Sequence, residues 1–511
     1  MEDSAMPSKP TPAGFTARHY CQGIGDCHLL RFPKADRSPF WMLIDCGVHT
    51  SISGGSELMD GIVEDIHAAT GGRIDVLVLT HEHADHLSAF LPSANRFADF
   101  RIGEIWMAWT ESDVDPQAQA LDKFKQQALT ALADASQRLN AARQLSPGLQ
   151  ALRAGVDALL GFSFGAKGEK IRALRKAAEA LAPDNIRYRE PGEPPITIKG
   201  LPNLRTYVLA PSRDERYLRI TEGSGETYRM ADDADGLRMA RALSCAFAAT
   251  AEGSAPNDPA APFDPSTGIR LSDLRRPAAA SSRKNSIEAF ARDHYFGPAI
   301  APGPAIRSRR PASPDTANER DQSWRRIDHD WLGTSADLAM QLDNKTNNTS
   351  LVLAFELVDT GRVFLFAADA QVGNWLSWHD TRWTLENGDV VTGPALLART
   401  VYYKVGHHGS HNATLGKKGL ELMVSKDLSA FIPTNEDDAK NVHWGEMPFE
   451  GVLSALEKHC GKRVIRADAA WLLGGKRPFR VPSGSIRNLR TGPGVAEDGD
   501  PRRRWVEVDL A

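Results

Sequence analysis

The chain has few cysteines and no long apolar run, and each of these features excludes some classes of protein. Its five cysteines are scattered through 511 residues without a Cys-x-x-Cys pair, which argues against a disulfide scaffold and a structural zinc ribbon. No apolar stretch approaches the roughly 18–20 residues that cross a bilayer. Residues 1–13 also lack the apolar core of a signal peptide. We therefore expect a cytoplasmic protein with no membrane partner.

The chain also lacks a large excess of either charge. The formal net charge is −4 and hydrophobic residues make up 41%, values that are ordinary for a soluble globular protein and exclude a uniformly basic nucleic-acid binder. Because 511 residues exceed a typical single domain, we expect two or three units, or one core with large insertions.

Histidine is scarce except in one short window. The chain has only 15 histidines, and three of them lie in the segment His81–His86, which reads H-E-H-A-D-H. The preceding Ile74–Thr80 is apolar and β-branched, which predicts a buried strand. His81 and His83 are two residues apart and point the same way in extended chain, and Asp85 follows where the chain turns into a helix. Imidazole and carboxylate ligands suit zinc, manganese or iron rather than calcium, whereas the alternative is a group of solvated or core histidines.

Two later strands also end in potential metal ligands. The apolar run Arg362–Ala368 ends at Asp369, where a carboxylate is costly unless it is paired or coordinated. A second predicted strand, Val401–Val405, is followed by His407 and His408. Three such strand ends predict a two-metal site, because that site needs ligands from separated elements.

The rest of the chain divides into two strand-rich halves and two insertions. Residues 1–110 alternate strands with a helix at Ser56–Ala69, and residues 344–511 return to strands with helices at Leu415–Leu428 and Pro448–Cys460. Residues 111–190 predict a helical insertion that begins at Asp115-Pro116. Residues 191–211 contain a returning strand, and 212–343 form a Pro/Ala/Arg-rich insertion. The predicted strands are Phe15–Tyr20, Cys27–Phe32, Phe40–Ile44, Val76–Thr80, Glu104–Ala108, Leu204–Ala210, Ser350–Leu357, Arg362–Ala368, Val401–Val405, Ala430–Pro433, Arg463–Arg466 and Trp505–Leu510.

One part of the second insertion is basic. Residues 270–326 contain twelve Arg and Lys but only six Asp and Glu, and Tyr295, Phe296 and Trp324 lie among them. This pattern could contact a nucleic-acid backbone. The alternative is a solvated, irregular insertion. The sequence predicts no particular protein partner.

The order of the ligand segments resembles that of the metallo-β-lactamase superfamily. The H-x-H-x-D-H motif at His81–His86, then Asp369 and His407, follow its pattern. Within the superfamily, four segments resemble the soluble hydrolase domain of the ComEC-type DNA-uptake proteins. They are Gly23–Asp26, Asn347–Val352, Phe366–Ala370 and Lys404–Ser410. The resemblance implies an α/β fold, an αββα sandwich with two large insertions.

The resemblance also implies roles for individual residues. His81 and His83 would hold one divalent metal ion, and Asp85, His86 and His407 a second, with Asp369 between them and His408 as the competing choice for His407. Zinc and manganese are the expected ions. The histidine that the superfamily usually places ahead of the bridging aspartate is missing from residues 344–350, so the His81 side is expected to be incomplete. The remaining expected contributors are Asp85, His408 and Lys404 in catalysis, and Asp45, Asp26, Asn348, Ser410 and His411 in supporting ligands or contacting substrate.

Three functions are compatible with this pattern. The first is a metal-dependent phosphodiesterase, such as a nuclease, because two metal ions can clamp the oxygens of a phosphodiester. The second is a hydrolase of a small ester, thioester, lactone or lactam, with the insertions as a lid. The third is a non-catalytic interaction scaffold. Cleavage of nucleic acids, cleavage of small esters or absence of bound metal would separate the three.

Overall fold

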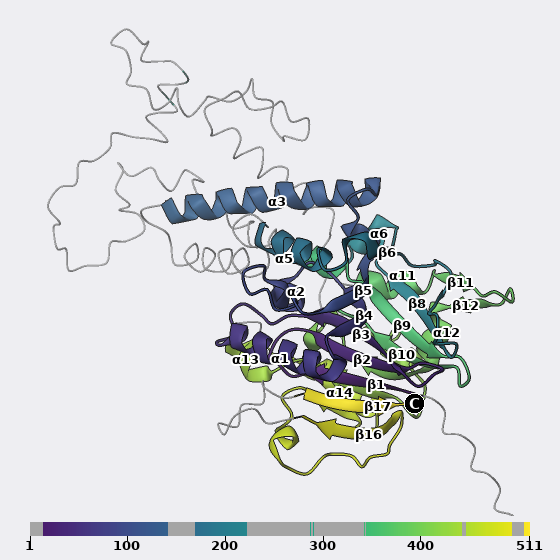
Figure 1. Cartoon of the computed structure of the whole chain (residues 1–511). Coiled ribbons are helices and arrows are strands. Elements are labelled where there is room, and N and C mark those ends of the chain that lie inside the picture. The colour runs from purple at the N-terminus through teal and green to yellow at the C-terminus, as the bar shows by residue number, and fades with distance from the viewer. Residues whose placement is uncertain are drawn as a thin grey trace, which may run out of the picture.

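Two β-sheets stack face to face in the computed structural model, and helices cover their outer faces (Figure 1). The structure describes residues 14–141, 169–221, 287, 290, 342, 344–441, 446–492 and 505–511. The first sheet has eight strands and the second has seven. This arrangement confirms the predicted αββα sandwich.

The first sheet joins the two ends of the chain. Its order is β16 (Ile486–Thr491), β17 (Trp505–Leu510), β1 (Phe15–Tyr20), β2 (Cys27–Pro33), β3 (Pro39–Cys46), β4 (Arg73–Leu79), β5 (Arg101–Ala108) and β6 (Ile186–Arg189). Neighbours from β16 to β3 are antiparallel, whereas β3, β4, β5 and β6 are parallel. The carboxyl ends of β3 and β4 therefore meet at one edge of the sheet.

The second sheet has a similar parallel part. Its order is β15 (Val464–Arg466), β14 (Ser429–Ile432), β13 (Thr400–Lys404), β10 (Arg362–Phe366), β9 (Val352–Leu357), β8 (Leu204–Ala210) and β7 (Ile196–Thr197). Strands β10, β13, β14 and β15 run parallel, so the chain leaves β10 and β13 at the same edge. The returning strand predicted in residues 191–211 is β8, which places this segment in the second sheet.

Apolar side chains fill the space between the sheets and under the helices. Aromatic rings pack among aliphatic side chains in the middle layer, where the ring of Phe15 lies 4.7 Å from Phe32 and 4.8 Å from Phe364. Helix α1 (Gly55–Thr70) buries Leu58 and Ile66 against the outer face of the first sheet. The outer face of the second sheet is covered by α11 (Val372–Trp378), α12 (Gly393–Ala398) and α14 (Glu450–His459). Shorter elements are α2 (Ala84–Leu87), α6 (Glu215–Leu218), α13 (Glu436–Asn441) and the hairpin of β11 (Arg382–Thr384) and β12 (Val390–Thr392).

The first insertion contributes two helices beside the edge where the strands end. Helix α3 (Pro116–Ala141) and helix α5 (Glu169–Glu179) lie above α2 in Figure 1. Asp115 caps α3, because its Oδ1 accepts hydrogen bonds from the backbone N–H groups of Gln117 and Ala118 at 2.9 and 3.0 Å. The basic segment 270–326 lies outside the described residues except for 287 and 290. Across the residues that the structure does describe, no helix is both long and apolar enough to cross a membrane.

The helix predicted at Leu415–Leu428 is wrong. Within it the structure has only a single helical turn, Leu420–Leu422. The backbone N–H of Leu420 bonds to the carbonyl of Leu415, five residues back rather than four. Gly419 explains the difference, because a Cβ there would lie 2.5 Å from the Leu415 carbonyl oxygen. The apolar spacing that predicted a helix instead serves packing under the second sheet.

Candidate metal centre

The candidate site forms where parallel strands of both sheets end. The loop His81–His86 follows β4, Asp369 follows β10, and the His407-His408 pair follows β13. The backbone at these ends is left-handed at non-glycine positions, with φ of 46° at Ala368, 43° at His407 and 55° at His408. Such conformations are sparsely populated and cluster at functional sites. Here they turn the chain sharply after β10 and β13.

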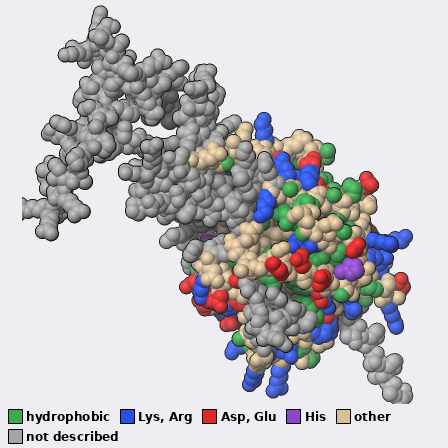
Figure 2. All heavy atoms as spheres, turned by 60° about the vertical axis from the view of Figure 1, so that its left-hand side comes forward, with side chains coloured by type: hydrophobic (Ala, Val, Ile, Leu, Met, Phe, Trp, Pro, Cys, Tyr) green, Lys and Arg blue, Asp and Glu red, His purple; other side chains and the backbone are tan. Residues whose placement is uncertain are grey.

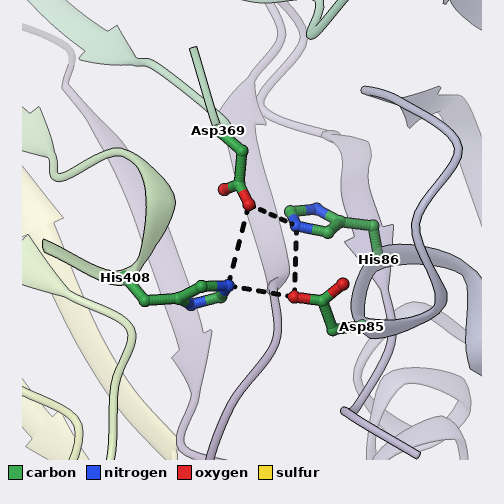
Figure 3. Close-up of side chains that lie close together, drawn as sticks. All are labelled: Asp85, His86, Asp369 and His408. Atoms are coloured by element: carbon green, nitrogen blue, oxygen red, sulfur yellow. Dashed lines mark hydrogen bonds and ion pairs between the residues drawn. The ribbon is translucent and has the colours of Figure 1, made fainter. Parts of the chain in front are cut away.

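Four side chains converge in one buried group (Figure 3). Asp85, His86, Asp369 and His408 each offer one ligand atom, and these atoms all lie within 4.8 Å of one another. His408 Nε2 lies 3.0 Å from Asp85 Oδ2, and His86 Nε2 lies 3.2 Å from Asp369 Oδ2. Two imidazole nitrogens and two carboxylate oxygens are a ligand set that suits zinc or manganese.

The electrostatics of this group fit a cation. Burial favours the neutral carboxyl of Asp369, yet the nearby His86 and His408 hold its pKa well below its ordinary value. Burial likewise opposes a charged His86, but Asp369, Asp85 and Asp45 raise its pKa well above the ordinary 6.5. Asp369 Oδ1 is buried without a hydrogen-bond partner among the described residues. The buried carboxylates are therefore stabilised by nearby positive charge, which a divalent ion can supply.

Asp45 and Thr80 hold His86 in its orientation. Asp45 Oδ2 lies 2.8 Å from His86 Nδ1, which leaves His86 Nε2 directed at the group. Asp45 in turn accepts hydrogen bonds from the backbone N–H and the hydroxyl of Thr80, at 2.9 and 2.6 Å. A carboxylate behind a ligand histidine fixes its tautomer and ring orientation. Thr80 was not predicted, because a threonine at the end of a strand carries no specific signal.

His81 and His83 lie beside the four-residue group but outside it. His81 Nε2 is 3.0 Å from His83 Nδ1 and 3.9 Å from Asp369 Oδ2. Residues 344–350, which contain no histidine, place Asn347 beside the site instead, and its Nδ2 lies 3.3 Å from His407 Nε2. This half of the site therefore offers two imidazoles and a shared carboxylate.

The structure separates the two histidines of the doublet. His408 is fully buried, and its Nδ1 lies 3.0 Å from the Pro433 carbonyl oxygen, which aims Nε2 at Asp85. His407 is partly exposed, and its Nδ1 lies 2.8 Å from Ser410 Oγ. The geometry thus brings His408 into the ligand group and leaves His407 at its margin.

Two other candidate residues lie away from the ligand atoms. The side chain of Asn348 bonds to backbone groups: its Nδ2 donates to the Ile220 carbonyl at 2.8 Å, and its Oδ1 accepts from the Gln371 N–H at 3.1 Å. The ring of His411 lies 6.1 Å from the ring of Phe449, at the start of α14. Neither residue belongs to the four-residue group.

Asp26 and Lys404 form a buried ion pair behind the site. Both side chains are only 1% exposed, and Lys404 Nζ contacts Asp26 Oδ2. Burial opposes the charged carboxylate, but Lys404 keeps the pKa of Asp26 well below its ordinary value. Lys404 is therefore occupied by Asp26 and is not directed at a phosphate in the site.

The Gly23–Asp26 turn packs directly on the metal loop. The backbone N–H of Asp26 donates to the Asp85 carbonyl oxygen at 3.1 Å. Gly25 has a φ of 138°, and a Cβ there would lie 2.7 Å from the same oxygen. Only glycine fits this approach, so the turn fixes the backbone that carries Asp85.

Glu82 connects the metal loop to the first insertion. Its two carboxylate oxygens each lie 2.7 Å from a cation, Lys125 of α3 and Arg175 of α5. The side chains of Glu82 and Arg175 are 9% and 6% exposed, so this pairing is shielded from water. Nothing in the spacing of the sequence indicates which cations meet Glu82, and the sequence therefore left this link unpredicted.

Metal uptake is expected to depend on pH. Nearby carboxylates raise the pKa values of His86 and His408 above 6.5, although burial opposes the charged imidazoles. An incoming ion must displace these protons, so apparent affinity rises as pH increases from 6.5 through the raised values. Over that window the metal-free protein loses the stability that the charged imidazoles contribute below 6.5. Calorimetric Zn²⁺ titrations in buffers of different ionisation enthalpy should show release of about one to two protons at pH 7; no release there contradicts the expectation.

Comparison with known proteins agrees with this geometry. A family model described as the metallo-beta-lactamase superfamily matches residues 25–155, a range that includes Asp45 and the whole His81–His86 loop. No curated protein matches the chain. The match and the buried group of nitrogen and oxygen ligands support a metal-dependent hydrolase in general. Residues 25–155, which carry the His81–His86 loop, therefore match the metallo-β-lactamase superfamily.

Proposed function

We propose that the protein is a metal-dependent phosphodiesterase that cleaves nucleic acid. The observation that supports it most is the convergence of Asp85, His86, Asp369 and His408 at the shared edge of the two sheets. The resemblance of Gly23–Asp26 and Lys404–Ser410 to the ComEC-type hydrolases points to a phosphodiester substrate rather than a lactam.

The proposed ligands form two sets, one for each of two zinc or manganese ions. Asp85, His86 and His408 would hold one ion, His81 and His83 the other, and Asp369 lies between the two sets. When bound, two such ions activate a water molecule and neutralise charge on the phosphate oxygens.

Several protein groups prepare the site for that chemistry. The Asp85 carboxylate can accept a proton from the attacking water, and its position is held by the turn that ends at Asp26. Asp45 keeps the Nε2 atom of His86 aimed inward. His407, the more exposed histidine of the doublet, lies at the margin, where it can contact the substrate, and the buried Ser410 can orient its ring through the 2.8 Å contact between Oγ and Nδ1.

Nucleic acid contact is proposed to come chiefly from the basic segment 270–326. Figure 2 shows Lys and Arg side chains interspersed with Asp and Glu on one face of the described residues. Such a face provides local cations without one long basic tract. The excess of arginine in segment 270–326 would supply contacts to the phosphates, because the cations on this face are not gathered in one place. We also propose a cytoplasmic location, because the sequence has neither an apolar signal-peptide core in residues 1–13 nor a long apolar run.

The test is a substrate panel with the purified full-length chain. After removal of metal by a chelator, Mn²⁺ or Zn²⁺ is restored and single- and double-stranded DNA, RNA, methyl p-nitrophenyl phosphate, esters, thioesters, lactones and lactams are offered. We expect diester cleavage at least about 100-fold above the chelated protein. Cleavage confined to esters, thioesters, lactones or lactams would overturn the proposal in favour of a small-molecule hydrolase. Absence of both bound metal and cleavage would favour a scaffold.

A further inference from the structure

A cavity of about 230 Å³ lies against the metal loop, under helix α3. Glu82 of the loop forms part of its wall, and Thr346 and Thr349 flank the segment that carries Asn347. The cavity is therefore lined by two segments that also carry residues of the candidate metal centre or its margin. Its full lining is Glu82, Thr110, Glu111, Ala120, Leu121, Asp122, Phe124, Lys125, Glu215, Leu218, Arg219, Leu342, Lys345, Thr346 and Thr349.

The walls of this cavity combine an aromatic ring, aliphatic side chains and hydroxyl groups. Phe124, Leu121 and Leu218 supply apolar surface, and Thr110 and Thr346 supply groups that can donate or accept hydrogen bonds. Mostly apolar walls with a few polar groups are typical of pockets for small organic groups. An acyl chain would leave the hydroxyls unused, whereas a flat heterocycle uses both kinds of surface.

The charges of the cavity do not suit a phosphate. Four carboxylates line it against three cations. Lys125 is already paired with Glu82 and Arg219 with Glu215, and the Lys345 ammonium lies over one face of the Phe124 ring, 5.7 Å from its centroid. A phosphodiester is therefore better placed at the metal centre, and the neutral part of the same nucleotide in the cavity.

We propose that this cavity binds the nucleobase adjacent to the scissile phosphodiester, with Phe124 as its stacking surface. The proposal rests on the proposed phosphodiesterase function. An aromatic side chain can stack on any base, which gives affinity with little sequence preference. Glu111 adds a group that can donate as well as accept a hydrogen bond near neutral pH, because burial and the nearby Glu82 raise its pKa to about 7.

The kinetic test compares two diesters that share one leaving group. Thymidine 5′-(p-nitrophenyl phosphate) carries a base, whereas methyl p-nitrophenyl phosphate does not. We expect the full-length wild type with Mn²⁺ to prefer the first, and Phe124→Leu to lower that preference in kcat/KM by roughly 5- to 100-fold. Phe124→Tyr retains a ring and should keep the preference. Val114→Ala, at a side chain 82% exposed and outside the cavity, is the matched control.

A binding measurement separates failure of the cavity from failure of the proposed function. Thymidine and adenosine are titrated into metal-free wild type and Phe124→Leu protein of similar melting temperature, with deoxyribose as the baseless probe. Tighter nucleoside binding by the wild type supports the cavity even if neither diester is cleaved. Nucleosides that bind no better than deoxyribose, or an unchanged preference in Phe124→Leu with active enzyme, would overturn the inference.

Discussion

Asp369→Asn is expected to lower kcat/KM by at least about 10³-fold and to reduce the bound metal. The substitution keeps the size of the side chain and removes its charge. Asp369 Oδ2 lies 3.2 Å from His86 Nε2, 3.7 Å from His408 Nε2 and 3.9 Å from His81 Nε2, so this one oxygen faces every part of the site. If Asp369 ligates the two proposed ions, losing its charge would remove several kcal/mol of transition-state stabilisation, at about 1.4 kcal/mol per tenfold.

The measurements are metal content per chain and kcat/KM on a cleaved diester. Asp359→Asn is the matched control, because Asp359 lies exposed in the turn between β9 and β10 of the same sheet. It should retain wild-type metal content and activity. If Asp369→Asn behaves like Asp359→Asn, the carboxylate has no part in the metal centre.

Much of the fold could be predicted because each strand carries its own apolar pattern. The predicted Phe15–Tyr20 and Trp505–Leu510 coincide with β1 and β17. Their pairing, in which Phe15 lies opposite Leu510, could not be read from the sequence because 495 residues separate the partners. The helix predicted at Leu415–Leu428 failed for a local reason, since the apolar period was present but Gly419 supports a different backbone.

The candidate site was predictable where ligands follow strands and less so where backbone geometry decides. Asp85, His86 and Asp369 were chosen because each follows a buried apolar run, and the structure brings them together. The choice between His407 and His408 depends on the left-handed turn at the doublet, which adjacent identical residues do not reveal. The pairing of Lys404 with Asp26 depends on the stacking of the two sheets, so sequence spacing could not indicate it.

His408→Ala is expected to lower both metal content and kcat/KM by at least about 100-fold, whereas His407→Ala lowers kcat/KM by about tenfold or less and retains the metal. His408 Nε2 lies 3.0 Å from Asp85 Oδ2, while His407 lies between Asn347 and Ser410. Loss of a ligand removes transition-state stabilisation. Loss of a side chain outside the ligand group has a smaller effect, and we expect it at the low end of the roughly 10- to 100-fold range that applies to residues orienting the ligands.

The two variants control for each other because both positions share a left-handed backbone, with φ of 43° and 55°. Alanine therefore meets similar backbone strain at either position. Melting temperature measured without metal reports the packing lost with the fully buried His408, and metal content measured on the same samples reports ligation. If His407→Ala loses the metal and His408→Ala retains it, the ligand is His407 and the sharp turn after β13 must rearrange when the ion binds.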